Sequence, residues 1–581
     1  MNNNSIYTIE KMRSRLAVAR GDQPADLILK NGRLVNVFSG EIIETNLAVQ
    51  NGLIAAIGDE YSQGRDIIDL EGKYLVPGLI DAHLHIESTL LMPPELARVV
   101  LPHGTTCIIN DPHEIANVLG TEGVKLMMAS AEKLPCDFYS TVPSCVPATD
   151  METAGAEITA KQVESLLKHP RIIGLGEMMN YPGLIDGDEE VLAKVIAAHN
   201  ENKVVDGHAP SVSGKDLQAY LGAGITTDHE CVNAAEAGEK LRSGMKIIIR
   251  HGSASSSLEE LLPLVNHSTV DAFMFGSDDR EAAELLARGH LDDLLKTAVS
   301  MGADPLHVIK IATINAARHY RLYNRGALAP GYLADMVVFK DLQSFKVDLV
   351  IKSGNVAARD GKLTIDIPPY SLPQSALNTV RIAREVSADD FALSLPGDKV
   401  AVIGVIPGQL VTEKLLLDIA REDDDTVIVK PGSGINKIVV VERHKASGRM
   451  AVGLVRGIGL AQGALASSVA HDSHNILVTG VEEKAMAAAV NKLAEIGGGF
   501  VAVDGSGKVK ACLPLPVAGL MSSESAVKVA AEMDNILAAA KELGTQLPQP
   551  FLTLSFLALP VIPSLKITDR GLFDVDNFEF L

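Results

Sequence analysis

The sequence predicts an α/β protein in which a (β/α)8 TIM-like barrel carries a small β-sandwich domain, built from both of its flanks, and a C-terminal α+β domain. Three observations favour this fold. The chain has 581 residues, which is more than one ordinary domain contains. Its middle part alternates apolar segments with amphipathic ones. Short strand-like segments lie on both sides of that middle part.

The two flanks share a pattern of short apolar segments separated by turns. In residues 1–75 the turns fall at Asn31-Gly32 and Asn51-Gly52, dipeptides that favour tight turns between strands. Residues 325–368 repeat this pattern with two further apolar segments. Because strands that flank an insertion can pair with each other, we predict that both flanks form one composite small β-domain.

Residues 76–324 are predicted to form the barrel, which is expected to be catalytic. The alternation of strands with amphipathic helices indicates parallel strands joined by crossover helices. In a closed barrel the carboxyl ends of the strands face one mouth, so residues far apart in the sequence become neighbours. The eight predicted strands span residues 76–85, 105–111, 138–143, 172–177, 203–208, 225–229, 246–250 and 272–278.

A further domain is predicted after residue 374. The segment before it contains Pro369, Ser371 and Pro373, a composition typical of a linker. Apolar segments that resemble strands then follow at residues 400–406 and 450–454, among others. We therefore predict an α+β domain over residues 375–581.

Composition and charge restrict the classes of partner. The chain has 52 Lys and Arg against 73 Asp and Glu, a formal net charge of −21, so its surface repels nucleic-acid phosphates and anionic lipid headgroups. The five cysteines form no Cys-x-x-Cys pair, which argues against a disulfide framework and a thiolate zinc site. We expect a cytoplasmic homo-oligomer, a dimer, that binds neither nucleic acid nor membrane.

The most informative local motif is PGLIDAHLH at residues 77–85, which ends the first predicted strand. Side chains two residues apart in a strand point to the same side, so His83 and His85 can present two imidazoles to one cation. Two histidines at this spacing can equally be hydrogen-bonded core residues. The motif therefore predicts a metal site only in combination with further ligands.

Such ligands stand at the ends of other predicted strands. Strands 4, 5, 6 and 8 end in Glu177, His208, His229 and Asp278, respectively. The resulting four imidazoles and two carboxylates exceed what one tetrahedral zinc ion needs, whereas two divalent ions can share them if Glu177 bridges. The sequence thus predicts two divalent metal ions, and these ligand types suit zinc, manganese and iron alike.

The sequence also resembles a known family. The strand-end residues and the split β-domain are similar to the amidohydrolase superfamily of metal-dependent barrel hydrolases. More specifically, nearly the whole chain resembles the bacterial adenine deaminase family. In the central region this resemblance lies in residues 83–88 (HLHIES), 111–117 (DPHEIAN), 174–180 (GLGEMMN), 206–210 (DGHAP) and 227–230 (TDHE). In the C-terminal region it lies in residues 470–475 (AHDSHN), 514–521 (PLPVAGLM) and 554–560 (LSFLALP).

The resemblance implies hydrolytic deamination of adenine to hypoxanthine and ammonia by a metal-bound hydroxide that attacks C6. We expect the two metal ions to be manganese or iron, with zinc as the alternative. Two positions depart from the family pattern. His251 follows Arg250 where a glutamate is usual, and Glu281 follows Arg280 where a histidine is usual. Another purine-like base therefore stays open as the substrate.

Roles for individual residues follow from this resemblance and from the spacing. Asp278 is expected to bind metal and to relay the proton of the attacking water, with pure ligation as the alternative. Glu87 and His113 are further acid–base candidates, although each can instead orient a metal-binding imidazole. The pair at positions 471 and 474 can form part of a substrate lid, a third metal site or a polar turn. The candidates for substrate binding are Glu87, Ser253, Asp279, His471 and His474.

Two other functions compete with deamination. A cyclic amidohydrolase of the dihydropyrimidinase or dihydroorotase kind would use the same metal pair. Those enzymes commonly bridge it with a carboxylated lysine, whereas strand 4 here ends in Glu177. A catalytically silent barrel that serves as an assembly module would have lost ligands, and all six are present. The ligand set therefore favours a hydrolase acting on the C–N bond of a cyclic amidine.

Overall fold

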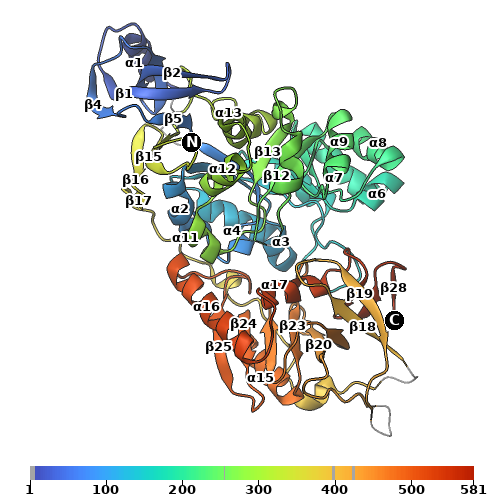
Figure 1. The fold of residues 1–581 in the computed structure, drawn as a ribbon. Coiled ribbons are helices and arrows are strands. Elements are labelled where there is room, and N and C mark those ends of the chain that lie inside the picture. The colour runs from blue at the N-terminus through green and yellow to red at the C-terminus, as the bar shows by residue number, and fades with distance from the viewer. Residues whose placement is uncertain (1–6, 254, 395–398, 422–425) are drawn as a thin grey trace.

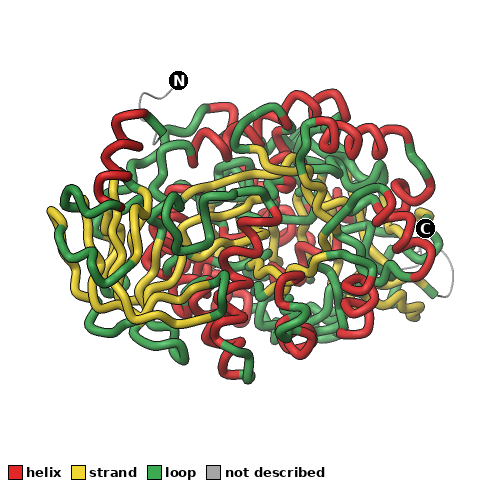
Figure 2. Tube along the Cα trace, turned by 90° about the horizontal axis from the view of Figure 1, so that it is seen from above, coloured by secondary structure: helices red, strands yellow, loops and turns green. Residues whose placement is uncertain are grey.

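The computed structural model describes residues 7–253, 255–394, 399–421 and 426–581. Its main parts are a sheet built from the two flanks, a central α/β region and a C-terminal part (Figure 1). Figure 2 shows the strands of the flanking sheet gathered at one end of the molecule, away from the C-terminus. None of the helices in the described ranges has the length and apolar character that crossing a lipid bilayer requires.

The flanking sheet pairs strands from both sides of the central region. Its order is β17-β16-β15-β14-β5-β1-β2-β3, and β4 also pairs with β1. The flanks meet where β5 runs antiparallel to β14, with Pro77 opposite Met336. The first flank contributes β1 (Ala25–Asn36), β2 (Glu41–Gln50), β3 (Leu53–Ile57), β4 (Gly64–Asp69) and β5 (Tyr74–Pro77). The second contributes β14 (Met336–Phe339), β15 (Val347–Lys352), β16 (Asn355–Arg359) and β17 (Lys362–Leu363).

In the predicted β-sandwich domain, all nine strands belong to one hydrogen-bonded sheet that both flanks build. Strand β1 is 12 residues long and has an irregular register between Leu29 and Gly32. It therefore pairs with β4 at its start and with β5 near its end. Helix α1 (Ile9–Ala19) packs on this sheet, and its Val18 lies in the same buried cluster as Ala48 of β2.

The central region contains eight parallel strands in two sheets, ordered β10-β9-β8-β7-β6 and β11-β12-β13. All eight predicted strands are present, but the first and the sixth are shorter than predicted. The chain passes at Gly78 from β5 in the flanking sheet to β6, and a Cβ there would lie 2.3 Å from Thr106 Oγ1, so only glycine fits. The strands are β6 (Leu79–Leu84), β7 (Thr105–Asn110), β8 (Asp137–Val142), β9 (Ile172–Met178), β10 (Val204–Gly207), β11 (Thr227–Asp228), β12 (Lys246–Arg250) and β13 (Phe273–Gly276).

Hydrogen bonds also join the edges of the two parallel sheets. Asp278 N, just after β13, donates to His83 O in β6 at 2.9 Å, and His85 N donates to Asp278 O at 3.3 Å. At the other edge, Thr226 N donates to Val205 O of β10 at 3.3 Å. The carboxyl ends of the first and last strands therefore lie side by side.

Amphipathic helices connect the parallel strands and pack against them. In α7 the side chain of Asp188 caps the first turn by accepting from Val191 N at 2.9 Å, and Val195 is buried with Leu175 of β9. The helices of this region are α2 (Pro93–Val100), α3 (His113–Leu119), α4 (Thr121–Ala131), α5 (Ala160–Leu167), α6 (Tyr181–Asp186), α7 (Glu189–Asn200), α8 (Gly214–Gly222), α9 (Ala234–Arg242), α10 (Leu258–Leu261), α11 (Ala282–Arg288), α12 (Leu291–Ser300), α13 (Pro305–Lys310) and α14 (Ala316–His319).

The C-terminal part contains an eight-stranded sheet of order β19-β18-β21-β20-β23-β22-β24-β25 and a small sheet of β26, β27 and β28. Its helices are α15 (Glu483–Glu495), α16 (Ala526–Glu542) and α17 (Pro550–Ser555). Its strands are β18 (Val400–Val405), β19 (Thr412–Leu417), β20 (Ile435–Val441), β21 (Met450–Arg456), β22 (Ala464–Ser467), β23 (Ile476–Gly480), β24 (Gly499–Val503), β25 (Val509–Pro514), β26 (Leu565–Thr568), β27 (Gly571–Asp574) and β28 (Glu579–Phe580).

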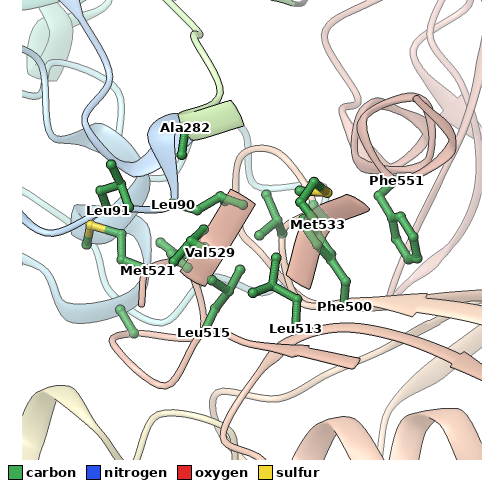
Figure 3. Close-up of a cluster of buried hydrophobic side chains, with 14 of the residues drawn as sticks. Leu90, Leu91, Ala282, Phe500, Leu513, Leu515, Met521, Val529, Met533 and Phe551 are labelled. Atoms are coloured by element: carbon green, nitrogen blue, oxygen red, sulfur yellow. The ribbon is translucent and has the colours of Figure 1, made fainter. Parts of the chain in front are cut away.

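One continuous hydrophobic core joins the C-terminal part to the central region (Figure 3). Leu90, Leu91 and Ala282 of the central region lie in this core. From the C-terminal part it includes Phe500, Leu513, Leu515, Met521, Val529, Met533 and Phe551. Because Leu90 and Leu91 follow β6 and Ala282 follows β13, the C-terminal part covers the carboxyl ends of the parallel strands.

Candidate metal centre

All six predicted ligand residues lie together at the carboxyl ends of five parallel strands. Five of them are buried, and the side chain of His208 is 24% exposed. The residues are His83 and His85 at β6, Glu177 in β9, His208 after β10, His229 after β11 and Asp278 after β13. The placement is a consequence of the parallel topology, because every such strand delivers its last side chains to the same side.

Glu177 lies between two groups of imidazoles. Its Oε1 is 3.4 Å from His85 Nε2, whereas its Oε2 is 2.7 Å from His208 Nδ1 and 3.0 Å from His229 Nε2. Burial alone would raise the pKa of Glu177, but His208 and His229 hold it well below its usual range. The ionised carboxylate can therefore contact both groups of imidazoles. Its Oε1 faces His85, and its Oε2 faces His208 and His229.

Asp278 lies beside the imidazoles of His83 and His85. Its Oδ1 lies 3.4 Å from His83 Nε2 and 3.3 Å from His85 Nε2, and its Oδ2 accepts from Arg250 Nη1 at 3.0 Å. Burial opposes ionisation, yet the two imidazoles and the Arg250 guanidinium hold the pKa of Asp278 well below its usual range. Arg250 is itself paired with Glu230. One oxygen of Asp278 is thus directed at the imidazoles and the other at a fixed cation.

The imidazoles are oriented as metal ligands require. His85 Nδ1 donates to Asp111 O at 2.9 Å, which leaves the Nε2 lone pair directed at Glu177 and Asp278. His83 Nε2 is buried and has no hydrogen-bond partner within the described part of the chain. Four nitrogens and two carboxylates with an unpartnered buried nitrogen fit divalent cations, which prefer this mixture of donors.

A buried tyrosine, Tyr320, connects two of the parallel strands. The Tyr320 hydroxyl lies 2.9 Å from both Ala82 O, next to His83, and Asp206 Oδ2, two residues before His208. Tyr320 is 3% exposed. It therefore ties the first strand of the region to the fifth.

We expect Tyr320→Phe to lower the free energy of unfolding by about 1–2 kcal/mol, because the substitution leaves buried hydrogen-bonding groups unsatisfied. Denaturant unfolding of the metal-loaded protein measures this effect. Metal content should stay unchanged, since the ligands themselves are intact. A variant as stable as the wild type would contradict the assigned role.

The two further acid–base candidates lie beside the six ligands. Glu87 Oε1 accepts from Ile115 N at 3.0 Å and its Oε2 has no partner in the described residues, while burial raises the pKa of Glu87 to about 7. His113 Nδ1 lies 3.3 Å from Glu177 Oε1. Its ring packs edge-on against that of His85. The side chain of His113 therefore faces the candidate metal centre.

A narrow cavity lies between the central and C-terminal parts, and its wall includes Asp279, the neighbour of Asp278, although none of the six candidate ligands lines it. Ser253 and Asp279, two predicted substrate-binding residues, line it together with Ser88, and Ser88 Oγ donates to Asp279 Oδ1 at 2.5 Å. Apolar side chains such as Leu90 and Phe551 form much of the remaining wall. The cavity therefore combines flat apolar surfaces with a few polar groups near the ligands.

The two histidines of the C-terminal motif occupy different positions. His471 lines the cavity and stacks on Phe556, with ring centroids 4.5 Å apart. His474 is fully buried, and its Nδ1 accepts from Ala470 N at 3.2 Å. Its Nε2 consequently carries hydrogen and lies 3.9 Å from Glu114 Oε2. Only His471 of this pair reaches the cavity.

The structure also adds residues for which no role was predicted. Asp111 accepts from Glu177 N at 2.9 Å, and Arg250 holds Asp278. Both stand at the ends of predicted strands, where side chains of a site are expected, so their positions in the sequence could have indicated a role. Asp472, between the two histidines of the C-terminal motif, lies with its Oδ1 4.0 Å from His113 Nε2.

The two departures from the family pattern differ in their relation to the cavity. Glu281 lines it, accepts from Gln549 Nε2 at 3.2 Å, and has its pKa raised by burial to about 7. His251 instead lies 2.9 Å, through Nδ1, from Ser256 Oγ and is not among the lining residues. Of these two positions, Glu281 is the one able to influence what the cavity accepts.

Known families match both large parts of the chain. Residues 74–357 match the amidohydrolase family, so the region with the parallel strands and the six candidate ligands is of the amidohydrolase class. Residues 409–579 match the adenine deaminase C-terminal domain.

Full-length relatives identify the family within that class. Adenine deaminase of Desulfatibacillum aliphaticivorans is 48% identical over 97% of this chain and 98% of its own length. Those of Kosmotoga olearia and Methanothrix thermoacetophila are each 46% identical, again over 97% of this chain and 98% of theirs. The chain belongs to the adenine deaminase family.

Proposed function

We propose that this protein is an adenine deaminase, which converts adenine and water to hypoxanthine and ammonia. The observation that carries the proposal is the position of Glu177, whose two oxygens face separate imidazole groups. A carboxylate in this position suits a two-metal hydrolase. The named relatives, matched over 97% of the chain, support adenine as the substrate.

Two divalent ions, manganese or iron with zinc as the alternative, fit this donor set. His83, His85 and Asp278 would hold one ion, His208 and His229 the other, and Glu177 would contact both. Bound there, the pair would lower the pKa of a water molecule enough for it to act as a nucleophile near neutral pH.

The protein's own groups supply proton transfer and orientation. Asp278, which Arg250 contacts at one oxygen, accepts a proton from the attacking water and returns it to the ring or to the departing ammonia. Glu87 and His113 are the next candidates to protonate or orient the base. The apolar walls of the cavity bind the faces of the planar ring, while Ser253 and Asp279 contact its edge.

The finer architecture is part of the same proposal. We infer that the two parallel sheets form one closed (β/α)8 barrel over residues 76–324, supported by the hydrogen bonds at both sheet edges. The composite β-domain would cover residues 1–75 and 325–368, and the C-terminal domain residues 375–581. A cytoplasmic dimer without nucleic-acid or membrane partners stays a prediction.

Ammonia release from adenine by protein loaded with manganese or iron tests the function. We expect release of one ammonia for each hypoxanthine formed. Hydrolysis of a dihydropyrimidine with no release from adenine would favour a cyclic amidohydrolase. Release from a different aminopurine, at a higher kcat/KM than from adenine, would show that the cavity bearing Glu281 accepts another base.

A further inference from the structure

A loop of the C-terminal part reaches the candidate metal centre. Side chains outside the loop hold its backbone through hydrogen bonds. It spans residues 470–475, between β22 and β23. Arg443 is fully buried and donates to Ala518 O at 3.1 and 3.0 Å, and also to His474 O. His444 Nε2 donates to Ser473 O at 2.7 Å, and Asn475 Nδ2 donates to Thr153 O at 2.9 Å. The backbone of the loop is therefore fixed, and its position does not depend on the side chain of residue 472.

Asp472 is the carboxylate that this loop directs toward the centre. It is 4% exposed, and its Oδ1 lies 4.0 Å from His113 Nε2. The other ring nitrogen of His113 lies 3.3 Å from Glu177 Oε1, so one imidazole separates Asp472 from the bridging carboxylate. Asp472 Oδ2 has no hydrogen-bond partner among the described residues. Leaving such a buried oxygen unpaired is unfavourable, and a ligand that donates a hydrogen bond to it would remove this penalty.

A metal ion is a poor explanation for the free oxygen. One metal-type group that involves this loop consists of Glu114, His471 and His474. His474 Nδ1 accepts a backbone N–H, so its Nε2 carries the hydrogen and has no lone pair for a cation. Asp472 is outside that group. The loop therefore supplies a hydrogen-bonding carboxylate rather than a third set of ligands.

We propose that Asp472 is a substrate-binding residue, whose free oxygen accepts a hydrogen bond from an N–H group of the purine. This inference rests on the proposed function. Adenine carries N–H groups on its ring and on its amino group, and a carboxylate pairs with such groups more strongly than a neutral acceptor does. A site built to pair an N–H also rejects molecules that lack it. The C-terminal part thus completes the site by contributing a polar contact to the substrate.

The test compares Asp472→Ala and Asp472→Asn with the wild type, all loaded with metal. We expect kcat/KM for adenine to fall by about a hundredfold in Asp472→Ala, and the dissociation constant of hypoxanthine to rise at least tenfold. Asp472→Asn retains one acceptor oxygen and should lose less of both. Metal content should stay at the wild-type value in both variants, because Asp472 is not a ligand.

Thr153→Ala is the matched control. Thr153 Oγ1 donates to Asp569 Oδ2 at 2.7 Å, so this variant removes a contact between the central and C-terminal parts without changing a group that faces the centre. It should bind hypoxanthine as the wild type does. If Thr153→Ala reproduces the loss seen in Asp472→Ala, the effect comes from domain docking and the proposal is wrong.

Three other results would overturn the proposal. Wild-type turnover and hypoxanthine affinity in Asp472→Ala would show that the carboxylate makes no contact with the base. Loss of metal ions from either variant would assign Asp472 to support of the metal centre. If Asp472→Ala fails to fold, Asp472→Leu, which has a similar size and no acceptor oxygen, takes its place, and full activity of that variant has the same meaning. A wild type that releases no ammonia from adenine contradicts the proposed function instead, which separates the two failures.

Discussion

Replacing Asp278 by Asn should lower the turnover of adenine by about a hundredfold or more while leaving most of the bound metal in place. Asparagine preserves the size of the side chain and one coordinating oxygen, but it cannot accept a proton at neutral pH. A lost general acid–base group typically costs a factor of 10²–10⁴. The measurement is ammonia release from adenine, with metal content determined on the same samples.

The control for this variant is Asp292→Asn. Asp292 Oδ2 pairs with His103 Nδ1 at 2.8 Å, so the control makes the same chemical change beside an imidazole outside the candidate centre. It should retain wild-type turnover. If Asp278→Asn keeps both its ions and most of its turnover, another residue carries the proton, and Glu87 and His113 are the next to test.

Replacing Glu177 by Gln should remove or weaken metal binding at both positions and abolish most of the activity. Glu177 Oε1 faces His85 and Oε2 faces His208 and His229, so one carboxylate serves both groups. The amide has one acceptor oxygen and no charge to balance the cations. We expect about two divalent ions per wild-type chain and well under one in the variant, measured by elemental analysis.

The same experiment has a structural readout. Metal that binds only the folded state raises the midpoint of thermal unfolding, so the wild type should lose stability in a chelator and Glu177→Gln should respond much less. Glu164→Gln, at an exposed ion pair with Lys168, should behave as the wild type does. One ion in the wild type, unchanged in Glu177→Gln, would contradict the two-metal arrangement.

Local patterns in the sequence predicted the central strands well. Each apolar segment was placed correctly because a buried parallel strand is apolar on both faces and ends where polar residues reach solvent or a site. The error at the first segment has a tertiary origin. Residues 74–84 are continuously apolar apart from Asp81 and His83, yet Gly78 divides them between two sheets. The difference is a matter of tertiary packing against Thr106.

The flanking sheet shows a second limit of local patterns. The pairing of both flanks was predicted from their shared turns, and β5 does pair with β14. The length of β1 and the neighbours that it meets at each end were not predicted. Strand length and partner choice are set by long-range hydrogen bonds rather than by any single segment.

The sequence by itself determined which residues could hold metal, since strand ends in a parallel region converge and His83, His85 and Glu177 are readable at such ends. Only the tertiary structure decided which atoms face each other. Three contacts join residues from separate strands and from the C-terminal part. Glu177 lies 2.7 Å from His208, Arg250 donates to Asp278, and Asp472 lies beside His113. Such contacts depend on the packing of one element on another, and the shared core around Leu91 fixes that packing.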